Sequence, residues 1–305
     1  MQKSEQKIVF TFGPVNSRRF GISLGIDLSP KEKCCNFDCL YCELKAKKPI
    51  DFIKDPPLVK EVVKEVEKKL SLHKNIDVIT ITSNGEPTLY ENLEELVDEL
   101  NKIKQNKKLL ILSNSSKICE ENIKKTLQKI DLVKLSLDCA TNRCFKRLDR
   151  PLKEIKLENI INCMQNLDLK TLIIEILVVE GINDNEKEFE KLNEILQIIK
   201  PNRVDIGTID RPPAYKVKKV DEEKLEFLAK KIKNLPVCLI KNNIPKEKEN
   251  FSKDEILNLL NHRPQSQFDI ENFFSQESKL QLQQLLNEKK VIKENIGGVE
   301  FYKAI

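Results

Sequence analysis

Three cysteines stand close together in the sequence, and no fourth metal ligand follows them nearby. They are Cys35, Cys39 and Cys42, which gives the spacing C-x3-C-x2-C. A four-iron cluster that is held by protein alone takes four cysteine thiolates, so a set of three leaves one iron open to another molecule. The spacing therefore predicts an iron–sulfur cluster with an open coordination position. Cys34 directly precedes the motif and spoils the spacing when it is counted as a ligand, so we interpret it as a bystander.

A zinc ion and a set of disulfides are the alternatives for these cysteines. Structural zinc usually takes two pairs of ligands from separate turns, but neither of the only two histidines, His73 and His262, has a companion at ligand spacing. The nine cysteines are odd in number and mostly scattered, which does not suit a disulfide framework. We expect the five cysteines outside the loop to be small core residues. They are Cys119, Cys139, Cys144, Cys163 and Cys238.

With an aromatic residue before its last cysteine, the loop resembles the hallmark motif of the radical S-adenosylmethionine (SAM) superfamily. In that superfamily three cysteines hold a 4Fe–4S cluster, and the open iron is chelated by the amino and carboxylate groups of SAM. The resemblance implies that Cys35, Cys39 and Cys42 are the cluster ligands and that Tyr41 lies beside the cofactors. It also implies that a 4Fe–4S cluster and SAM are those cofactors.

Alternating helices and strands must position this loop. Apolar residues at helical spacing predict helices over residues 58–72, 91–104, 119–129, 153–166 and 185–199. Apolar runs predict strands over residues 22–28, 76–81, 109–112, 132–137, 173–179 and 204–207. This alternation predicts an α/β fold with a parallel sheet of about six strands. The resemblance implies that the sheet is the partial (β/α)6 barrel of the radical SAM superfamily.

Polar residues follow several of the predicted strands. In parallel α/β folds ligands gather at the carboxyl ends of the strands, so these residues are candidates for binding. Each of them taken alone is a turn or helix-cap signal. Together they resemble the superfamily's SAM site in order and in rough spacing. The resemblance implies SAM contacts from Gly85, Glu86, Pro87, Ser113, Asn114, Ser136 and Asp138.

The segment over residues 85–87 resembles the "GGEP" segment of the superfamily, with Asn84 in place of the first glycine. In the superfamily its backbone and its acid receive the methionine amino group of SAM. The departure at Asn84 matters little if the segment binds mainly through main-chain carbonyls. Ser136 and Asp138 stand where the superfamily contacts the ribose or the carboxylate.

Segments over residues 13–19, 35–39 and 210–214 resemble a subgroup that is related to tRNA wyosine-synthesis enzymes. This similarity implies relatedness and not a shared substrate. The archaeal wyosine enzymes bind a second cluster through an additional N-terminal cysteine set, and the absence of such a set from this sequence counts against the same reaction. Arg18, Arg19 and Arg211 lie in these segments, and guanidinium groups bind carboxylate or phosphate in a bidentate manner. We therefore expect them to bind an anionic substrate, the alternative being surface or ion-paired arginines.

The composition limits the classes of function. The chain has 305 residues, of which 40% are hydrophobic, so it can bury one large core and a small one. The sequence shows neither a signal peptide nor an apolar run near the roughly 20 residues of a membrane helix. We expect a cytoplasmic protein that does not bind membranes, since thiols stay reduced in the cytoplasm. A net charge of +5 is weak evidence for nucleic-acid binding.

The pattern changes near the C-terminus. We predict a barrel domain over residues 1–240, a linker over 241–250 and a winged-helix-like domain over 251–305, with three helices and a hairpin. Residues 251–305 hold seven Lys and Arg against eight Asp and Glu, so a basic footprint for nucleic acid is missing. We favour a role in protein interaction or in presenting the substrate.

Two functions from different classes follow. The leading hypothesis is a radical SAM oxidoreductase that acts on an RNA-linked or other anionic substrate, with tRNA or a protein as partner and a flavodoxin- or ferredoxin-type electron donor. The alternative is an iron–sulfur redox-sensing regulator with a winged-helix output domain. A zinc-stabilised binding module is a third hypothesis. The polar strand ends favour the enzyme, because a sensor has no use for a SAM site.

Overall fold

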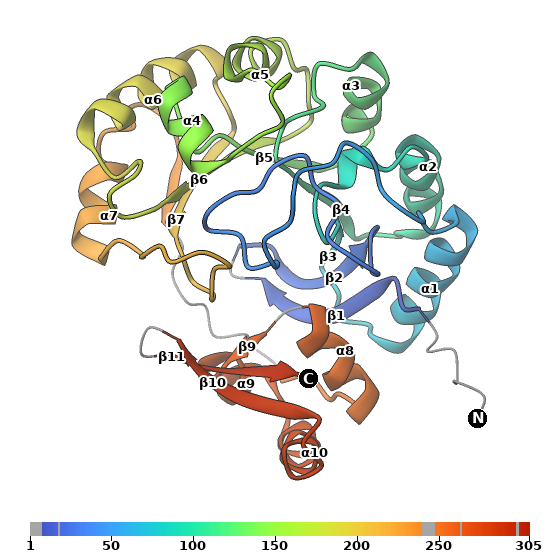
Figure 1. Cartoon of the computed structure of the whole chain (residues 1–305). Coiled ribbons are helices and arrows are strands. Elements are labelled where there is room, and N and C mark those ends of the chain that lie inside the picture. The colour runs from blue at the N-terminus through green and yellow to red at the C-terminus, as the bar shows by residue number, and fades with distance from the viewer. Residues whose placement is uncertain (1–7, 18, 240–247, 263, 297–298) are drawn as a thin grey trace.

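An eight-stranded sheet forms the centre of the molecule. The structure is a computed structural model that describes residues 8–17, 19–239, 248–262, 264–296 and 299–305. The sheet order is β1 to β8 in sequence, and it curls into an open barrel with helices on its outer side (Figure 1). The strands are β1 Thr11–Ser17, β2 Gly21–Asp27, β3 Val78–Thr82, β4 Lys108–Ser113, β5 Leu132–Ser136, β6 Leu172–Val178, β7 Arg203–Thr208 and β8 Val237–Leu239.

The strands from β2 to β8 are parallel, which confirms the predicted α/β fold. The six predicted strands are all present, and the short strand β8 extends the same sheet beyond β7. β1 was not predicted. It pairs with β2 in antiparallel fashion at the sheet edge, with an irregularity between Phe12 and Val15. Its Gly, Pro, Asn and Ser residues resemble a turn, and a proline is tolerated at such an edge position.

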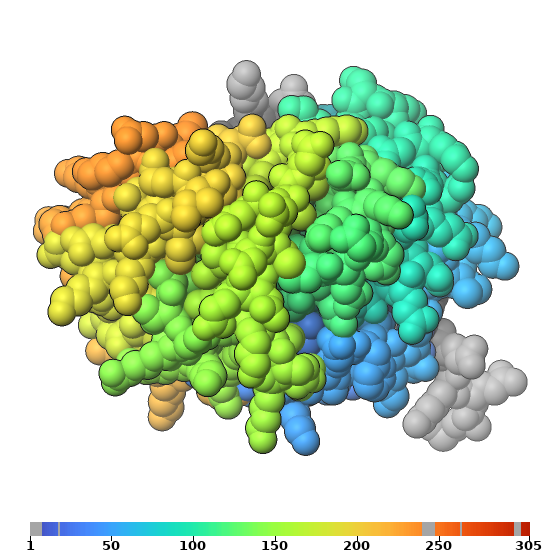
Figure 2. Space-filling view, turned by 90° about the horizontal axis from the view of Figure 1, so that it is seen from above, coloured from blue at the N-terminus to red at the C-terminus, as the bar shows by residue number. Residues whose placement is uncertain are grey.

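The predicted helices are present on the outside of the barrel, with one more between them and one after the last. They are α1 Val59–Leu72, α2 Leu93–Ile103, α3 Glu121–Gln128, α4 Asn142–Leu148, α5 Leu157–Met164, α6 Glu186–Ile199 and α7 Glu222–Ala229, with a short 3-10 turn η1 at Pro87–Leu89. Figure 2 shows the outer wall, where α2, α3, α5 and α6 follow one another in chain order. Each helix turns an apolar stripe inward; in α1 the buried stripe is Val62, Val66 and Leu70. No helix in the described ranges is long and apolar enough to cross a membrane.

A smaller unit packs against the β1 edge of the barrel (Figure 1). It consists of α8 Lys253–His262, β9 Gln265–Ser266, α9 Gln267–Phe273, α10 Gln276–Asn287, β10 Val291–Ile296 and β11 Val299–Ala304. Its three helices and hairpin were predicted, whereas the winged-helix interpretation stays a prediction, as do the domain boundaries. Val15 of β1 belongs to the core of this unit. Most of the predicted linker lies outside the described residues.

Four of the cysteines outside the loop form disulfides, which was not expected, although Cys139 and Cys144 are buried core residues as expected. Cys119 pairs with Cys163, and Cys139 pairs with Cys144. The partners of the first pair are 44 positions apart in the sequence, and only the packing of their segments brings their Cα atoms to 5.4 Å. Cys238 is free.

Candidate functional site: the cysteine loop and the barrel cavity

The cysteine loop docks on the end of β3 through the main chain of Cys34. The Cys34 amide donates to the Asn84 carbonyl at 2.8 Å, and the Glu86 amide donates to the Cys34 carbonyl at 2.9 Å. Gly85 has a φ of +148°, and a Cβ on it would lie 1.7 Å from the Cys34 carbonyl oxygen. Glycine is therefore required here. The Cys34 thiol is buried in the core, so this residue contributes its backbone and not a ligand.

Two further segments hold the loop from the other sides. The Leu40 amide donates to the Leu148 carbonyl at the end of α4, and the Ala214 amide donates to the Cys42 carbonyl, at 2.9 and 2.8 Å. Asp38, inside the motif, accepts a hydrogen bond of 2.5 Å from the Tyr215 hydroxyl. Segments after β3, β5 and β7 thus hold the loop at the carboxyl ends of the strands.

The three motif thiols are free but poorly suited to ionise by themselves. Burial raises the pKa of Cys35 to about 12 and that of Cys39 well above the usual thiol value; burial also raises the pKa of Cys42. Thiolates are the form that binds metal, so these cysteines need a cation to become ligands.

The buried ammonium of Lys33 lies beside the motif thiols, where an anionic cluster would be bound. Its side chain is buried, and its ammonium lies 3.5 Å from the Asp38 carboxylate, with no hydrogen bond to it or to any other group in the described part of the chain. Burial alone would lower the pKa of Lys33, yet the negative charges of Cys42 and Cys35 in their thiolate forms raise it. A buried ammonium that faces the motif thiols and has only the Asp38 carboxylate near it fits a cluster that carries negative charge.

The spread of the motif sulfurs separates a cluster from a single ion. Two sulfurs on one zinc ion lie at most about 4.6 Å apart, since each Zn–S bond is about 2.3 Å. The sulfurs of Cys35, Cys39 and Cys42 do not all lie within 4.8 Å of one another. The motif sulfurs are therefore not gathered at the spacing of a single zinc site.

A compact group does exist elsewhere, where the sulfurs of Cys139 and Cys144 lie close to the Glu188 carboxylate. This group is closed to metal. Its sulfurs form a disulfide, and Glu188 Oε1 accepts the amides of Ala140 and Thr141 at 2.7 and 2.9 Å.

The predicted SAM residue Glu86 is committed inside the protein. Its carboxylate accepts hydrogen bonds from the Thr88 hydroxyl at 2.6 Å, the Ser113 hydroxyl at 2.8 Å and the Asn114 amide at 2.6 Å. It is 1% exposed and braces the ends of β3 and β4. Pro87 opens the turn that follows and is buried as well. The carboxylate therefore has little capacity left for a ligand amino group.

Asn114 and Asp138 lie beside the cysteine motif. The Asn114 side-chain amide lies 3.6 Å from the Cys35 sulfur. The Tyr41 hydroxyl donates to Asp138 Oδ2 at 2.5 Å, while the Leu177 amide donates to Asp138 Oδ1 at 2.7 Å. Burial raises the pKa of Asp138 to about 6. Ser136 lines a small pocket together with Tyr41, Asn114 and Asp138.

The predicted anion-binding arginines are ion-paired where the structure describes them. The Arg19 guanidinium lies 2.9 Å from Glu175 and 2.6 Å from Asp205, and Arg211 lies 2.9 Å from Glu43. An anionic substrate would have to compete with these carboxylates, so the ion-paired alternative holds for both arginines. Arg18 lies outside the described residues.

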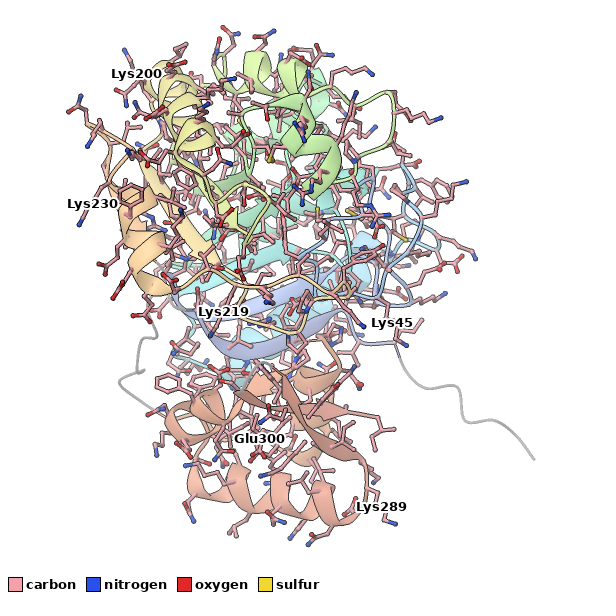
Figure 3. The ribbon with its side chains drawn as sticks, turned by 60° about the vertical axis from the view of Figure 1, so that its left-hand side comes forward. Lys45, Lys200, Lys219, Lys230, Lys289 and Glu300 are labelled. Atoms are coloured by element: carbon pink, nitrogen blue, oxygen red, sulfur yellow. A yellow bond between two sulfur atoms is a disulfide. The ribbon has the colours of Figure 1, made fainter. Side chains whose placement is uncertain are left out.

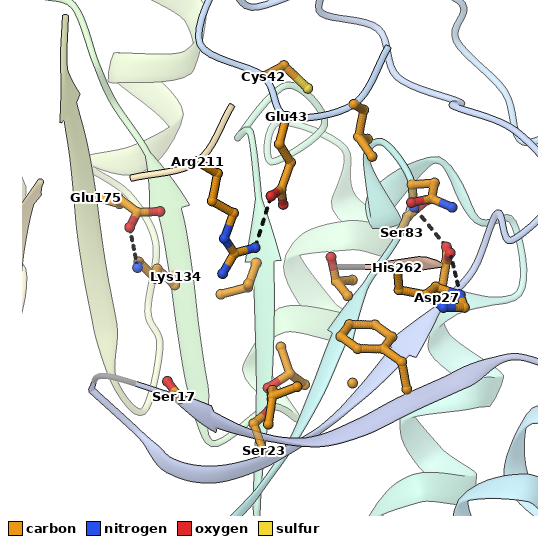
Figure 4. A pocket seen from close by; sticks show the side chains of 18 of the residues that line it. Ser17, Ser23, Asp27, Cys42, Glu43, Ser83, Lys134, Glu175, Arg211 and His262 are labelled. Atoms are coloured by element: carbon orange, nitrogen blue, oxygen red, sulfur yellow. Dashed lines mark hydrogen bonds and ion pairs between the residues drawn. The ribbon is translucent and has the colours of Figure 1, made fainter. Parts of the chain in front are cut away.

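A cavity of about 460 Å³ fills the barrel interior (Figure 4). Among the predicted site residues it brings together Tyr41, Cys42, Gly85, Arg19 and Arg211. Glu86, Ser113, Asn114, Ser136 and Asp138 do not line it.

The cavity is also lined by polar residues that sequence reasoning did not identify, among them Asp27, Lys134, Glu175 and His262. Asp27 ends β2, so the rule that ligands gather at strand ends would have found it. Lys134 and Glu175 lie within strands, and His262 comes from the C-terminal unit, so no local signal marks them.

Comparisons with known proteins agree with this architecture. Residues 33–193 match the family described as "Radical SAM superfamily". The chain is 38% identical to a UPF0026 protein of Helicobacter pylori (strain ATCC 700392 / 26695), and the match covers 100% of both chains. A probable GTP 3′,8-cyclase of Methanococcus aeolicus is 30% identical over 66% of this chain and 66% of its own. A structure of TYW1 with a bound lysine-pyruvate adduct shares the fold, with a TM-score of 0.53 and 18% identity over 70% of this chain and 74% of that one.

Proposed function

Because the chain belongs to the radical SAM superfamily, we propose that it holds its cofactors at the cysteine loop and acts on a substrate inside the barrel cavity. It is an enzyme, and the cofactors of its superfamily are a 4Fe–4S cluster and SAM. When bound, the reduced cluster supplies the electron that cleaves SAM to methionine and a 5′-deoxyadenosyl radical, which abstracts hydrogen from the substrate. The main support for this proposal is that the three free thiols lie in one loop, and that this loop also lines the cavity.

The residues of the loop have distinct roles in this proposal. Cys35, Cys39 and Cys42 hold the cluster, and the buried Lys33 ammonium balances its negative charge. The docking contact between Cys34 and Gly85 orients the loop toward the cavity.

SAM binding in this proposal falls mainly to groups other than the Glu86 carboxylate. The main chain of the Gly85 segment and the Asn114 side chain lie next to the loop, and the Tyr41–Asp138 pair lies on its other side. Ser113 and Ser136 support this arrangement from the ends of β4 and β5. The hydrogen bond between Ala214 and Cys42 keeps the segment after β7 against the loop, which helps to exclude water.

The cavity favours a small polar substrate, or one group of a larger molecule inserted from outside. Its volume lies within the range of ordinary ligand pockets. The similarity to a GTP 3′,8-cyclase supports an anionic substrate of nucleotide type. Exposed lysines such as Lys45, Lys200, Lys230 and Lys289 point outward from different parts of the molecule (Figure 3), which does not favour a broad RNA-binding face. The electron donor in this proposal is a flavodoxin- or ferredoxin-type protein.

The redox-sensing alternative has no support in these similarities. It also leaves the cavity that adjoins the cysteine loop without a purpose.

The test of the proposed function is anaerobic. The full chain is reconstituted with iron and sulfide, reduced with dithionite and incubated with SAM, and 5′-deoxyadenosine is measured by mass spectrometry. We expect it to form with the wild type and to be lost with Cys39→Ala. Cys238→Ala, which removes a free cysteine outside the loop, is the matched control and should retain the reaction. Retention of both the iron and the reaction by Cys39→Ala would contradict the proposed ligand set.

A further inference from the structure

Asp27 and His262 meet in the wall of the barrel cavity, although they come from the barrel and from the C-terminal unit (Figure 4). Asp27 is 1% exposed. Its Oδ1 accepts the amides of Ser29 at 2.9 Å and Asn84 at 2.7 Å. Its Oδ2 has no hydrogen-bond partner in the described part of the chain and faces His262 Nε2 at 3.5 Å.

The position of the His262 ring fixes which of its nitrogens carries hydrogen. Nδ1 lies 2.8 Å from the Asn258 carbonyl, one helical turn earlier in α8, so Nδ1 is the donor. The ring stacks on Phe12 with its centroid at 5.2 Å and an interplanar angle of 10°. A neutral imidazole in this tautomer presents Nε2 as an acceptor.

Two acceptors facing each other in a buried wall are unfavourable unless a proton lies between them. The pair therefore retains one proton, on Asp27 or on His262, when no other donor is present. Burial also raises the pKa of Asp27, in agreement with a proton kept at this pair.

We propose that His262 is a positioning residue for SAM binding: with Asp27 it holds one proton, and through the Asn84 amide this pair orients the segment that carries Gly85. This inference rests on the proposed function. The C-terminal unit then completes the cofactor chamber and is not a separate output domain.

A continuous series of polar contacts supports this assignment. His262 faces Asp27, Asp27 accepts the Asn84 amide at 2.7 Å, and the Asn84 carbonyl accepts the Cys34 amide at 2.8 Å. Cys35, the first predicted cluster ligand, follows directly. Asp27, Asn84, Gly85 and His262 all line the same cavity, so the pair lies next to the segment that it orients.

The test measures SAM affinity in the full, reconstituted chain by equilibrium dialysis with labelled SAM. We expect His262→Leu to weaken SAM binding about tenfold, in the range found for residues that orient direct ligands. His262→Gln, whose amide can still donate to Asp27, should stay within about threefold of the wild type. The iron content of both variants should equal that of the wild type.

The chain offers a matched control, because its only other histidine also lies between the two units. His73 Nε2 is 3.3 Å from Glu255 of α8, and neither residue lines the cavity. His73→Leu should leave SAM affinity unchanged. Equal weakening of SAM binding by His73→Leu and His262→Leu would show a general effect of docking and overturn the inference. The inference would also be overturned if His262→Leu kept the wild-type SAM affinity and the wild-type shift of the electron paramagnetic resonance signal on SAM binding.

A second measurement does not depend on SAM and covers the case in which His262→Leu fails to fold. In His73→Gln a single imidazole remains, and its nitrogens are observable by 15N NMR in the full chain without iron. We expect Nδ1 to carry hydrogen and the Nε2 resonance to move when Asp27→Ala removes the partner. An unmoved Nε2 resonance overturns the inference. If the wild type shows this proton but binds no SAM, the proposed function fails and the positioning role fails with it.

Discussion

Arg19 donates to Glu175 at 2.9 Å across the barrel interior, although the two residues are 156 positions apart in the sequence. Lys134 shares the same carboxylate at 2.5 Å. Burial alone would raise the pKa of Glu175, but Lys134 and Arg19 lower it, so the carboxylate stays charged at neutral pH. The hairpin that carries Arg19 is thereby tied to β6, and through the shared carboxylate to Lys134 of β5.

Removing this carboxylate should destabilise the barrel. Glu175→Gln leaves Lys134 and Arg19 with Asp205 as their remaining partner, and we expect a loss of about 2 kcal/mol or more in the free energy of unfolding. Urea denaturation at pH 7 measures it. Glu186→Gln, which breaks an exposed ion pair with Lys231, is the control and should cost less than about 1 kcal/mol. Equal effects of the two variants would contradict the assigned role.

Gly85→Ala should prevent the cysteine loop from docking. The added Cβ would lie 1.7 Å from the Cys34 carbonyl oxygen, so the loop must move away from β3. We expect the reconstituted variant to hold less than half of the wild-type iron, as measured by a colorimetric iron assay and the visible absorption of the cluster.

Gly181→Ala is the control for this variant. Gly181 also has a positive φ, of +70°, but no atom lies within 4 Å of an added Cβ. It shares the backbone strain without the clash, so its iron content should be that of the wild type. Loss of iron in both variants would show that strain and not docking is responsible.

Lys33→Met should lower the reduction potential of the bound cluster. Removing a buried positive charge makes the added electron less stable, and an interaction of about 2 kcal/mol corresponds to a shift on the order of 100 mV. Redox titration followed by electron paramagnetic resonance measures the shift. Lys31→Met removes an exposed lysine paired with Asp55 and should leave the potential in place. An unchanged reduction potential in Lys33→Met would contradict an electrostatic interaction between this ammonium and the cluster.

The contact between the barrel and the C-terminal unit should weaken in acid. Hydrogen bonds from His73 and Lys69 hold the pKa of Glu255 well below its usual range. A lowered carboxyl pKa stabilises the fold above the unfolded-state value of about 4.3, and this stability is lost as the pH falls. Because solvent screens this partly exposed group, we expect Glu255→Gln to cost only about 1 kcal/mol at pH 7.

The difference between Glu255→Gln and the wild type should shrink as the pH falls from 5 toward 2. Urea denaturation at several pH values measures it. A difference that stays constant across this range would contradict the ionic origin of the effect.

Much of the barrel was predictable because its elements carry local patterns. The parallel strands are apolar runs and the helices have apolar stripes, both of which are read within a short window. β1 was missed because its glycine and proline resemble a turn, and only pairing with β2 makes it a strand. The disulfides Cys119–Cys163 and Cys139–Cys144 were missed because pairing depends on how segments pack.

The sequence by itself predicted the chemistry of the cysteine loop, because the three proposed ligand cysteines and the aromatic residue between them lie within eight consecutive residues. Their spacing is a local property of the chain. Only the tertiary structure decided that Glu86 is a brace, that Arg19 is ion-paired with Glu175, and that His262 faces Asp27. These relationships join residues from different elements. A buried polar or charged side chain needs a partner, but the sequence around it does not show which distant residue the fold will place beside it.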